Sequence, residues 1–160
     1  MSTVWIASAV ILLGGPVGGD DAVAFSPVNV CFKVERPTEK AFRTAEEWEA
    51  FNRAAALRLA DGAPPIDFEQ KMVVAHFDGS GSACVGFTVE KVEIGDNAVT
   101  VRATRSTSPH PCIAVVAYPQ VVLEVPRKNL PVRFRIRNVR KEPSVQPRRC
   151  SGQPETGPTR

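Results

Sequence analysis

The residues whose types and spacing could support chemistry gather in the stretch "DGSGSAC", from Asp78 to Cys84. A phosphate-binding loop needs glycines that lead into a helix, because free backbone N–H groups and the helix dipole hold the anion. A serine nucleophile needs a base within reach and an elbow such as GxSxG. Here no helix pattern or lysine follows, and Gly79 and Gly81 directly flank Ser80. The stretch therefore predicts a chain reversal between two strands, with positive φ at Gly79 and Gly81.

The chain has two histidines that could act as general bases. His76 lies in the apolar run "MVVAHF", which is typical of a half-buried strand residue. His110 lies two residues before Cys112, and a Cys–His dyad is conceivable there if the thiol is reduced. Three carboxylates stand beside expected turns, where acidic side chains commonly hydrogen-bond the backbone, and these are Asp67, Glu69 and Asp78. We predict no catalytic residue, and the alternative left open is a small hydrolase that uses His110.

Four cysteines, Cys31, Cys84, Cys112 and Cys150, agree with an oxidising compartment. They form no CxxC or HxxxH spacing, so we predict neither a metal site nor a cofactor. Four cysteines allow three pairings, and we favour Cys84 with Cys112 and Cys31 with Cys150. In a simple meander Cys84 and Cys112 would flank a strand, about 9–10 Å apart, whereas a disulfide needs Cα atoms within about 7 Å. The pairing therefore requires either a loop that folds over the strand end or another strand order.

The N-terminus carries an apolar run from Val4 to Leu13 that is too short to cross roughly 30 Å of hydrocarbon as a helix. It fits the apolar region of a signal peptide, and the small residues Ala22 to Ala24 place cleavage before Phe25. No lysine or arginine precedes the run, so an apolar segment packed on the domain is the alternative. We predict a signal peptide over 1–24, a periplasmic or secreted protein, and no membrane anchor after cleavage.

The positive charge is concentrated near the C-terminus. The whole chain has a formal net charge of +3, but Pro126 to Arg160 contain ten Lys+Arg and two Glu, a difference of +8. The alternating run "VRFRIR" would place Arg133, Arg135 and Arg137 on one face of a strand. They could meet an acidic protein, a glycan or a nucleic acid, or keep an edge strand from pairing with other chains. With one Tyr and two Trp, the chain shows no stacking platform for single-stranded nucleic acid.

Hydrophobic periodicity predicts one helix and about seven short strands. Thr44 and Glu47 form a capping box, and Trp48 begins an apolar face of a helix from about Ala45 to Leu59. The expected strands are 28–35, 72–77, 85–94, 98–105, 112–117, 121–126 and 132–137. The all-apolar run at 72–77 favours a central strand that is covered on both faces. We predict an α+β, mainly β fold over 28–141, an antiparallel sheet or small β-sandwich with one N-terminal helix packed on it, and a disordered Pro-rich tail over 142–160.

The order of the motifs resembles the C-terminal domain of the protease complex subunit PrcB family. The motifs are Trp48 in the helix, Asp67 and Phe68 before the first core strand, Gly86 and Phe87 in the next strand, and Val125 and Pro126 followed by Pro131, Val132 and Phe134. The likeness covers about 42–134. It implies a subunit that accompanies and stabilises an extracytoplasmic serine protease and has no catalytic residues. Where the family usually has Thr-Gly-Gly, this chain has Cys84, Val85 and Gly86, which suggests a disulfide-bearing branch that also uses Cys112.

Taken together, the patterns predict an exported, non-enzymatic protein-binding domain whose partner is another extracytoplasmic protein, such as a serine protease. The loops at 78–83 and 106–111 are the expected contact site, since loops on a rigid scaffold often carry recognition. The candidate partner-binding residues are Asp78, Ser80, Ser82, His110, Arg133, Arg135 and Arg137. Two alternatives stay open: a polyanion-binding module that uses the three arginines, and a protease inhibitor.

Overall fold

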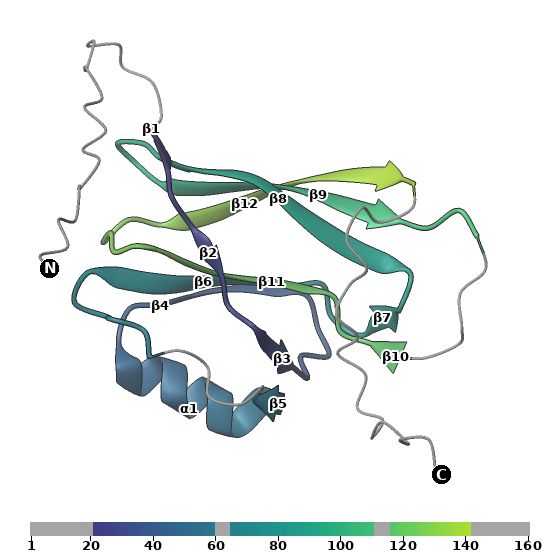
Figure 1. The fold of residues 1–160 in the computed structure, drawn as a ribbon, viewed down its shortest axis with the longest axis horizontal. Coiled ribbons are helices and arrows are strands. Elements are labelled where there is room, and N and C mark those ends of the chain that lie inside the picture. Colours follow the sequence, from purple (N-terminus) through teal and green to yellow (C-terminus); the bar gives the residue numbers. More distant parts are fainter. Residues whose placement is uncertain (1–20, 60–64, 111–115, 142–160) are drawn as a thin grey trace, which may run out of the picture.

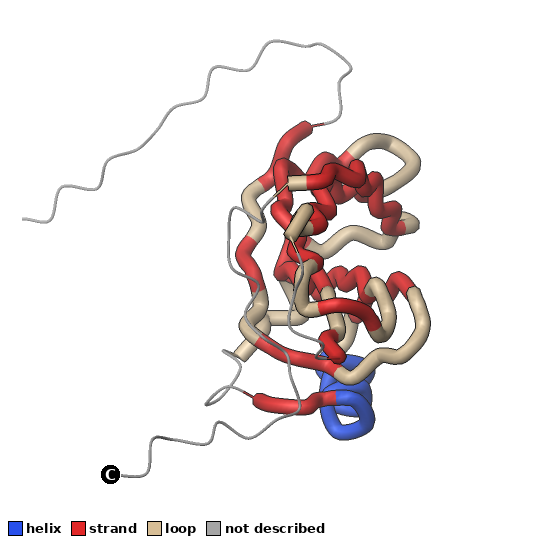
Figure 2. Tube along the Cα trace, turned by 90° about the vertical axis from the view of Figure 1, so that its right-hand side faces the viewer, coloured by secondary structure: helices blue, strands red, loops and turns tan. Residues whose placement is uncertain are grey.

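The computed structural model describes residues 21–59, 65–110 and 116–141, which form two stacked β-sheets and one helix (Figure 1). The outer sheet has the order β1 (Asp21–Val23), β8 (Val85–Ile94), β9 (Val99–Thr107) and β12 (Val132–Arg140). The central sheet has the order β2 (Ser26–Pro27), β11 (Gln120–Pro126), β6 (Lys71–Phe77) and β4 (Thr38–Phe42). Figure 2 shows the helix α1 (Ala45–Ala55) at the end of the stack that lies farthest from the outer sheet. This confirms the mainly β fold with one packed helix.

Two short ribbons complete the fold within the described ranges. β3 (Val30–Phe32) pairs with β5 (Ala56–Leu59), and β7 (Gly81–Ser82) pairs with β10 (Val116–Ala117). The seven expected strands correspond to β3, β6, β8, β9, β10, β11 and β12, although β3 is shorter than 28–35 and residues 111–115 lie outside the described part. Residues 1–20 of the predicted signal segment and the predicted tail at 142–160 also lie outside it.

β12 runs parallel to β9, which departs from a purely antiparallel sheet. β11 pairs with β6 in the central sheet, and residues 127–131 then carry the chain across to the outer sheet. β12 consequently starts at the same end as β9, with Val132 opposite Val99 and the Val99 N–H donating to the Pro131 carbonyl at 2.9 Å. The outer sheet is therefore mixed, and β12 forms one of its edges.

The strand β6 is buried on both faces, as its apolar run predicts. Met72 and Val74 point into the core between the two sheets, with Val92, Val99, Val101 and Leu123. Val73, Ala75 and Phe77 point into a second core beneath α1. Each core lies against alternate residues of the same strand, because successive side chains of a strand face opposite ways. β6 is thus the central element on which both layers pack.

The helix starts where the sequence predicts and ends earlier. The Thr44 hydroxyl accepts the Glu47 N–H at 3.2 Å, and the Glu47 carboxylate accepts the Arg43 N–H at 2.9 Å, so the two side chains cap the first turn. The predicted end at Leu59 is wrong, because Ala56 adopts extended dihedrals and begins β5. The Lys33 N–H donates to the Ala55 carbonyl at 2.8 Å. Pairing with β3 therefore replaces the last expected helical turn.

Aromatic rings fix α1 to the central sheet. Trp48 packs edge-on against Phe32 and Phe42, with ring centroids 5.6 and 5.2 Å apart. Phe51 lies 4.9 Å from Phe32 and 5.5 Å from Phe77. Such pairs stabilise beyond the area they bury, so they fasten the helix to the central sheet. No helix in the described ranges is long and apolar enough to span a membrane.

Candidate partner-binding surface

The predicted contact loops meet at one end of the sandwich. The Gly-Ser stretch leaves β6, forms β7 and pairs with β10, which lies beside it at the right of Figure 1. The loop after β9 lies next to it, because the Ser108 N–H donates to the Cys84 carbonyl at 3.1 Å. We call the described residues 78–84, 106–110 and 116–119 the loop end. The fold therefore brings together two segments that the sequence separates.

Gly79 holds the first turn of the loop end in place. Its φ is +82°, and a Cβ atom built on it would lie 3.0 Å from the Glu35 carbonyl oxygen and 3.1 Å from Pro37 Cδ. The next residue, Ser80, donates its backbone N–H to the same carbonyl at 3.2 Å. The prediction of positive φ is confirmed at Gly79 and wrong at Gly81, which lies in β7 with extended pairing to Ala117.

Asp78 anchors the loop end to the outer sheet. Its carboxylate oxygen Oδ2 lies 2.8 Å from Arg105 Nε, and the two side chains are only 23% and 29% exposed. Arg105 also donates to the Thr107 hydroxyl at 3.2 Å, and the Asp78 N–H donates to the Pro119 carbonyl at 3.0 Å. These contacts orient the Asp78 carboxylate toward β9. Among the predicted contact residues, Asp78 therefore holds the loop end against β9.

The exposed part of the loop end combines small polar residues with one apolar side chain. Ser80, Ser82 and His110 are exposed, and the Ser82 hydroxyl accepts the Cys84 N–H at 3.2 Å. Val116, opposite Ser82 in the ribbon, is 60% exposed and is the large hydrophobic residue that the described part of the chain leaves exposed. Sequence reasoning missed Val116, because the run "CIAVVA" is typical of a buried strand.

The described cysteines are consistent with oxidation. Neither Cys31 nor Cys84 is a free thiol, and the Cys84 sulfur lies 4.0 Å from the His110 carbonyl oxygen. The chain that leads toward Cys112 thus passes the end of β9 and reaches Cys84, and β10 pairs with β7 and not with β9, so the strand order is not a simple meander. Cys112 and Cys150 lie outside the described residues, so both pairings and the His110–Cys112 dyad stay predictions.

His76 belongs to the core between the sheets. Its ring lies 5.6 Å from the Phe87 ring and 5.4 Å from the Phe134 ring, and its Nδ1 lies 3.4 Å from a carboxylate oxygen of Glu39. Its side chain is largely buried, which confirms the strand interpretation. The Asp67 carboxylate accepts the Glu69 N–H at 3.0 Å, as expected for a turn. In the described ranges, no three His, Cys, Asp or Glu side chains group as metal ligands would.

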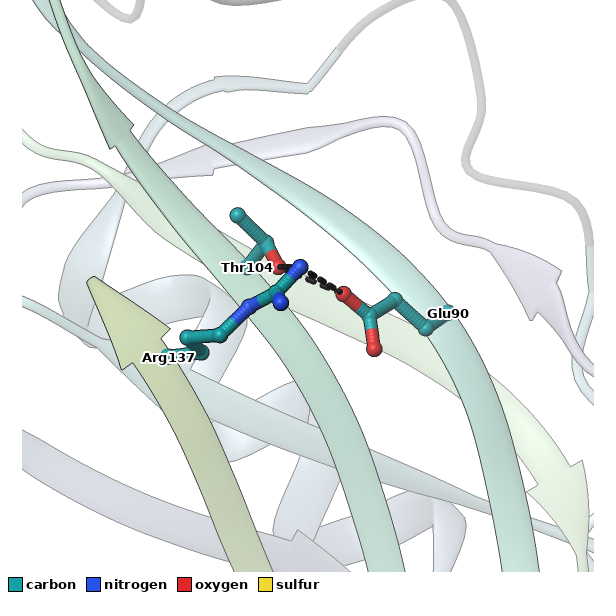
Figure 3. A network of polar contacts seen from close by, with 3 residues as sticks. All are labelled: Glu90, Thr104 and Arg137. Atoms are coloured by element: carbon teal, nitrogen blue, oxygen red, sulfur yellow. Dashed lines mark hydrogen bonds and ion pairs between the residues drawn. The ribbon is translucent and has the colours of Figure 1, made fainter. Parts of the chain in front are cut away.

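The arginines of β12 lie on the outer face of the outer sheet. Arg133, Arg135 and Arg137 are exposed, whereas the residues between them are half-buried. Arg137 Nη2 lies 3.4 Å from Glu90 Oε1 and 3.4 Å from the Thr104 hydroxyl (Figure 3). Within the part of the chain that the structure describes, Arg133 and Arg135 form no ion pair. On this face, Arg133 and Arg135 therefore keep positive charge that no described carboxylate pairs with.

A buried carboxylate stands in the middle of this outer face. Glu93 lies 2.6 Å from Lys91 Nζ and 2.6 Å from Arg102 Nε. The hydrogen bonds from Lys91 and Arg102 hold the pKa of Glu93 below its ordinary value. Glu93 thus places a negative charge between Lys91 of β8 and Arg102 of β9 on this face.

Comparisons with known proteins identified no relative of this chain. No protein-family model matches the chain, and no curated protein or solved structure is detectably similar to it. The resemblance to the PrcB family therefore depends on the sequence motifs. In the structure these motifs have packing roles, since Trp48 and Phe68 contribute to the core under α1 and Val125 to the core between the sheets.

Proposed function

We propose that this chain is an exported, non-enzymatic domain that binds another extracytoplasmic protein through its loop end. The observation that carries the proposal is the gathering of exposed residues from two neighbouring loops beside Val116 at one end of the packed sandwich. An exposed apolar side chain bordered by small polar residues suits a protein contact, because the partner can cover it while polar rim atoms remain satisfied. The motif resemblance implies that this partner is a serine protease and that the domain stabilises it.

The contact can be tested by site-specific photo-crosslinking in the native periplasm or culture medium. A photoreactive residue at Ser80 lies on the loop end, and one at Asn97 lies in the turn between β8 and β9 at the opposite end of the sheet. Both positions are exposed, so the pair forms a matched control. We expect a discrete cross-linked protein from Ser80 and none from Asn97. Equal labelling from the two positions would contradict the proposal.

Stabilisation and inhibition are separated by activity measurements on the partner. If the captured protein is a protease and the domain stabilises it, adding the purified domain prolongs the half-life of the protease activity. If the domain is an inhibitor, a stoichiometric amount abolishes cleavage of a protein substrate at once. An unchanged half-life with unchanged activity would remove both roles.

A second candidate function is the binding of an anionic polymer, which the exposed arginines of β12 favour. Arg133 and Arg135 project from the same face at strand spacing. Such binding weakens steeply with salt because counterions are released from the polymer. Retention on heparin that falls sharply between low and physiological salt, and that is lost in an Arg133→Ala/Arg135→Ala variant, would support this candidate. Salt-independent or absent retention would exclude it.

A further inference from the structure

The strand β12 has one edge that no described strand occupies. β9 pairs with one side of β12 over its whole length, and β12 ends the order of the outer sheet. Near its start, β12 approaches the end of β4, where the Arg43 guanidinium donates to the carbonyls of Leu130 at 2.7 Å and Lys128 at 3.2 Å. The two strands then separate, and the far end of β12 lies well away from β4 in Figure 1. Unpaired backbone groups along such an edge can pair with another chain.

The inner side of β12 is only partly covered. Val132, Phe134 and Ile136 face the same way as their register partners Val99, Val101 and Ala103 on β9. The three β9 residues are almost completely buried, whereas the three β12 residues are half-buried. Neighbouring side chains on an added strand would cover this remaining apolar surface. The inner side of the edge therefore favours a partner strand with apolar residues at alternate positions.

The outer side of β12 selects the charge of the partner. Arg133, Arg135 and Arg137 repeat every second residue, which is a spacing of about 6.6 Å along a strand. A second copy of β12 would bring arginines beside arginines, and like charges directly opposite each other destabilise strand pairs. A strand with Glu or Asp at alternate positions has the same repeat and the opposite charge. The arginines thus disfavour self-association and fit an acidic strand.

From these three features we propose that β12 receives, by strand addition, an extended protein segment in which acidic residues alternate with apolar ones. This inference rests on the proposed protein-binding function and names a second surface for it. A glycan or nucleic acid would use the arginines but neither the backbone edge nor the half-buried apolar side. The combination of all three features on one strand is what favours a peptide over other polyanions.

The proposal is tested with synthetic peptides and the full chain. The probe has nine residues, the length of β12, with Glu at alternate positions and Val and Thr between them. The control peptide has the same composition with its glutamates in one block. Two further peptides carry backbone N-methyl groups at the odd or at the even positions, so that each blocks hydrogen bonds along one side of the added strand. Binding is measured by fluorescence anisotropy at physiological salt.

Strand addition predicts that the alternating peptide binds more tightly than the control peptide whose glutamates are consecutive. It also predicts that one N-methylated peptide loses binding while the other keeps it. Replacing Arg135 by Glu should weaken the alternating peptide about fivefold to tenfold, because an attractive cross-strand pair becomes repulsive. Arg53→Glu makes the same charge change on the exposed surface of α1 and should leave binding unchanged. An Arg135→Ala variant removes the attraction without adding repulsion and should therefore weaken binding less than Arg135→Glu, whereas unchanged urea unfolding of both variants excludes misfolding.

Equal binding of the alternating peptide, the consecutive-glutamate peptide and both N-methylated peptides would indicate simple charge attraction and not strand addition. Displacement of the alternating peptide by a heparin fragment as effectively as by the unlabelled peptide would indicate the same. Absence of binding by every peptide would overturn the inference and leave the Ser80 cross-link as the test of the loop end. Peptide binding without a Ser80 cross-link would keep the β12 inference and remove the loop end as the contact. The two proposals therefore fail on different measurements.

Discussion

The replacement of Gly79 by alanine tests whether the loop end is held by close backbone contact. The left-handed conformation at φ +82° costs an L-residue about 1–2 kcal/mol. The new Cβ atom would also lie 3.0 Å from the Glu35 carbonyl oxygen and 3.1 Å from Pro37 Cδ, which have no side-chain rotation that could relieve the contact. Displacing that segment resembles overpacking and adds about 1–2 kcal/mol. The expected loss of stability is therefore about 2–4 kcal/mol.

Gly81→Ala is the matched control for this substitution. Gly81 has no positive φ, and a Cβ atom at this position would have Pro119 Cδ as its nearest neighbour at 3.9 Å, an ordinary contact distance. We expect its stability to stay within about 0.5 kcal/mol of the wild type. Urea unfolding followed by far-ultraviolet circular dichroism gives both values, and the melting temperature of Gly79→Ala should fall by about 4–16 °C for a chain of this size. Equal unfolding midpoints for the two variants would show that backbone conformation and close contact at Gly79 do not stabilise the fold.

Four further predictions concern the core, the outer face, the N-terminus and the cysteines. Trp48→Ala should destabilise the fold by about 3–5 kcal/mol, and Trp48→Phe by clearly less, because the ring fills the aromatic core under α1; urea unfolding measures both. Glu93→Gln should lower the free energy of unfolding at pH 7. The difference in this free energy from the wild type should disappear as the pH falls below about 4.5, because a carboxylate with a lowered pKa stabilises the fold only while it is charged. Unfolding at several pH values checks this, and a constant difference would contradict it. Cleavage before Phe25, as the sequence predicts, would remove β1, which pairs with β8 through Asp21–Val23. If a signal segment is removed, we therefore now expect cleavage before Asp21; intact mass locates the terminus, and a start at Phe25 would oppose this expectation. Non-reducing peptide mapping should recover Cys84 joined to Cys112, and free thiols at these positions would overturn the pairing.

Local patterns were enough to predict the parts of the fold that depend on neighbouring residues. The capping pair Thr44 and Glu47 marked the helix start, and the apolar run of β6 marked a strand covered on both faces. The hairpin between β8 and β9 follows its turn residues, with the Gly95 N–H donating to the Ala98 carbonyl at 3.0 Å. These features need no information about distant segments, which explains why the sequence alone indicates them.

The errors arise where distant segments meet. The helix ends at Ala55 because β3 pairs with the residues that follow, and a helix-favouring pattern cannot reveal that competitor. The parallel pairing of β12 depends on the chain crossing between sheets, which strand periodicity leaves open. The missing positive φ at Gly81 reflects its pairing with β10. Tertiary pairing therefore decided each of these positions.

The candidate surface was predictable in part. The alternation of "VRFRIR" correctly placed three arginines outward, because period-2 patterns fix the face of a strand. Asp78 and Ser80 belong to the loop end as expected, but the ion pair of Asp78 with Arg105 joins residues 27 positions apart. Val116 gave no signal, because an apolar residue in an apolar run is expected to be buried, and its exposure is visible only in the folded structure.

The most direct test of the central claim measures the affinity of the captured partner for two variants of the purified domain. Val116→Asp places a negative charge on the loop end, and Asn97→Asp places the same charge in the exposed turn at the opposite end of the sheet. We expect Val116→Asp to weaken binding at least about tenfold, which corresponds to about 1.4 kcal/mol, and Asn97→Asp to stay within about twofold of the wild type. Equal affinities for the two variants would contradict the claim that the loop end binds the partner.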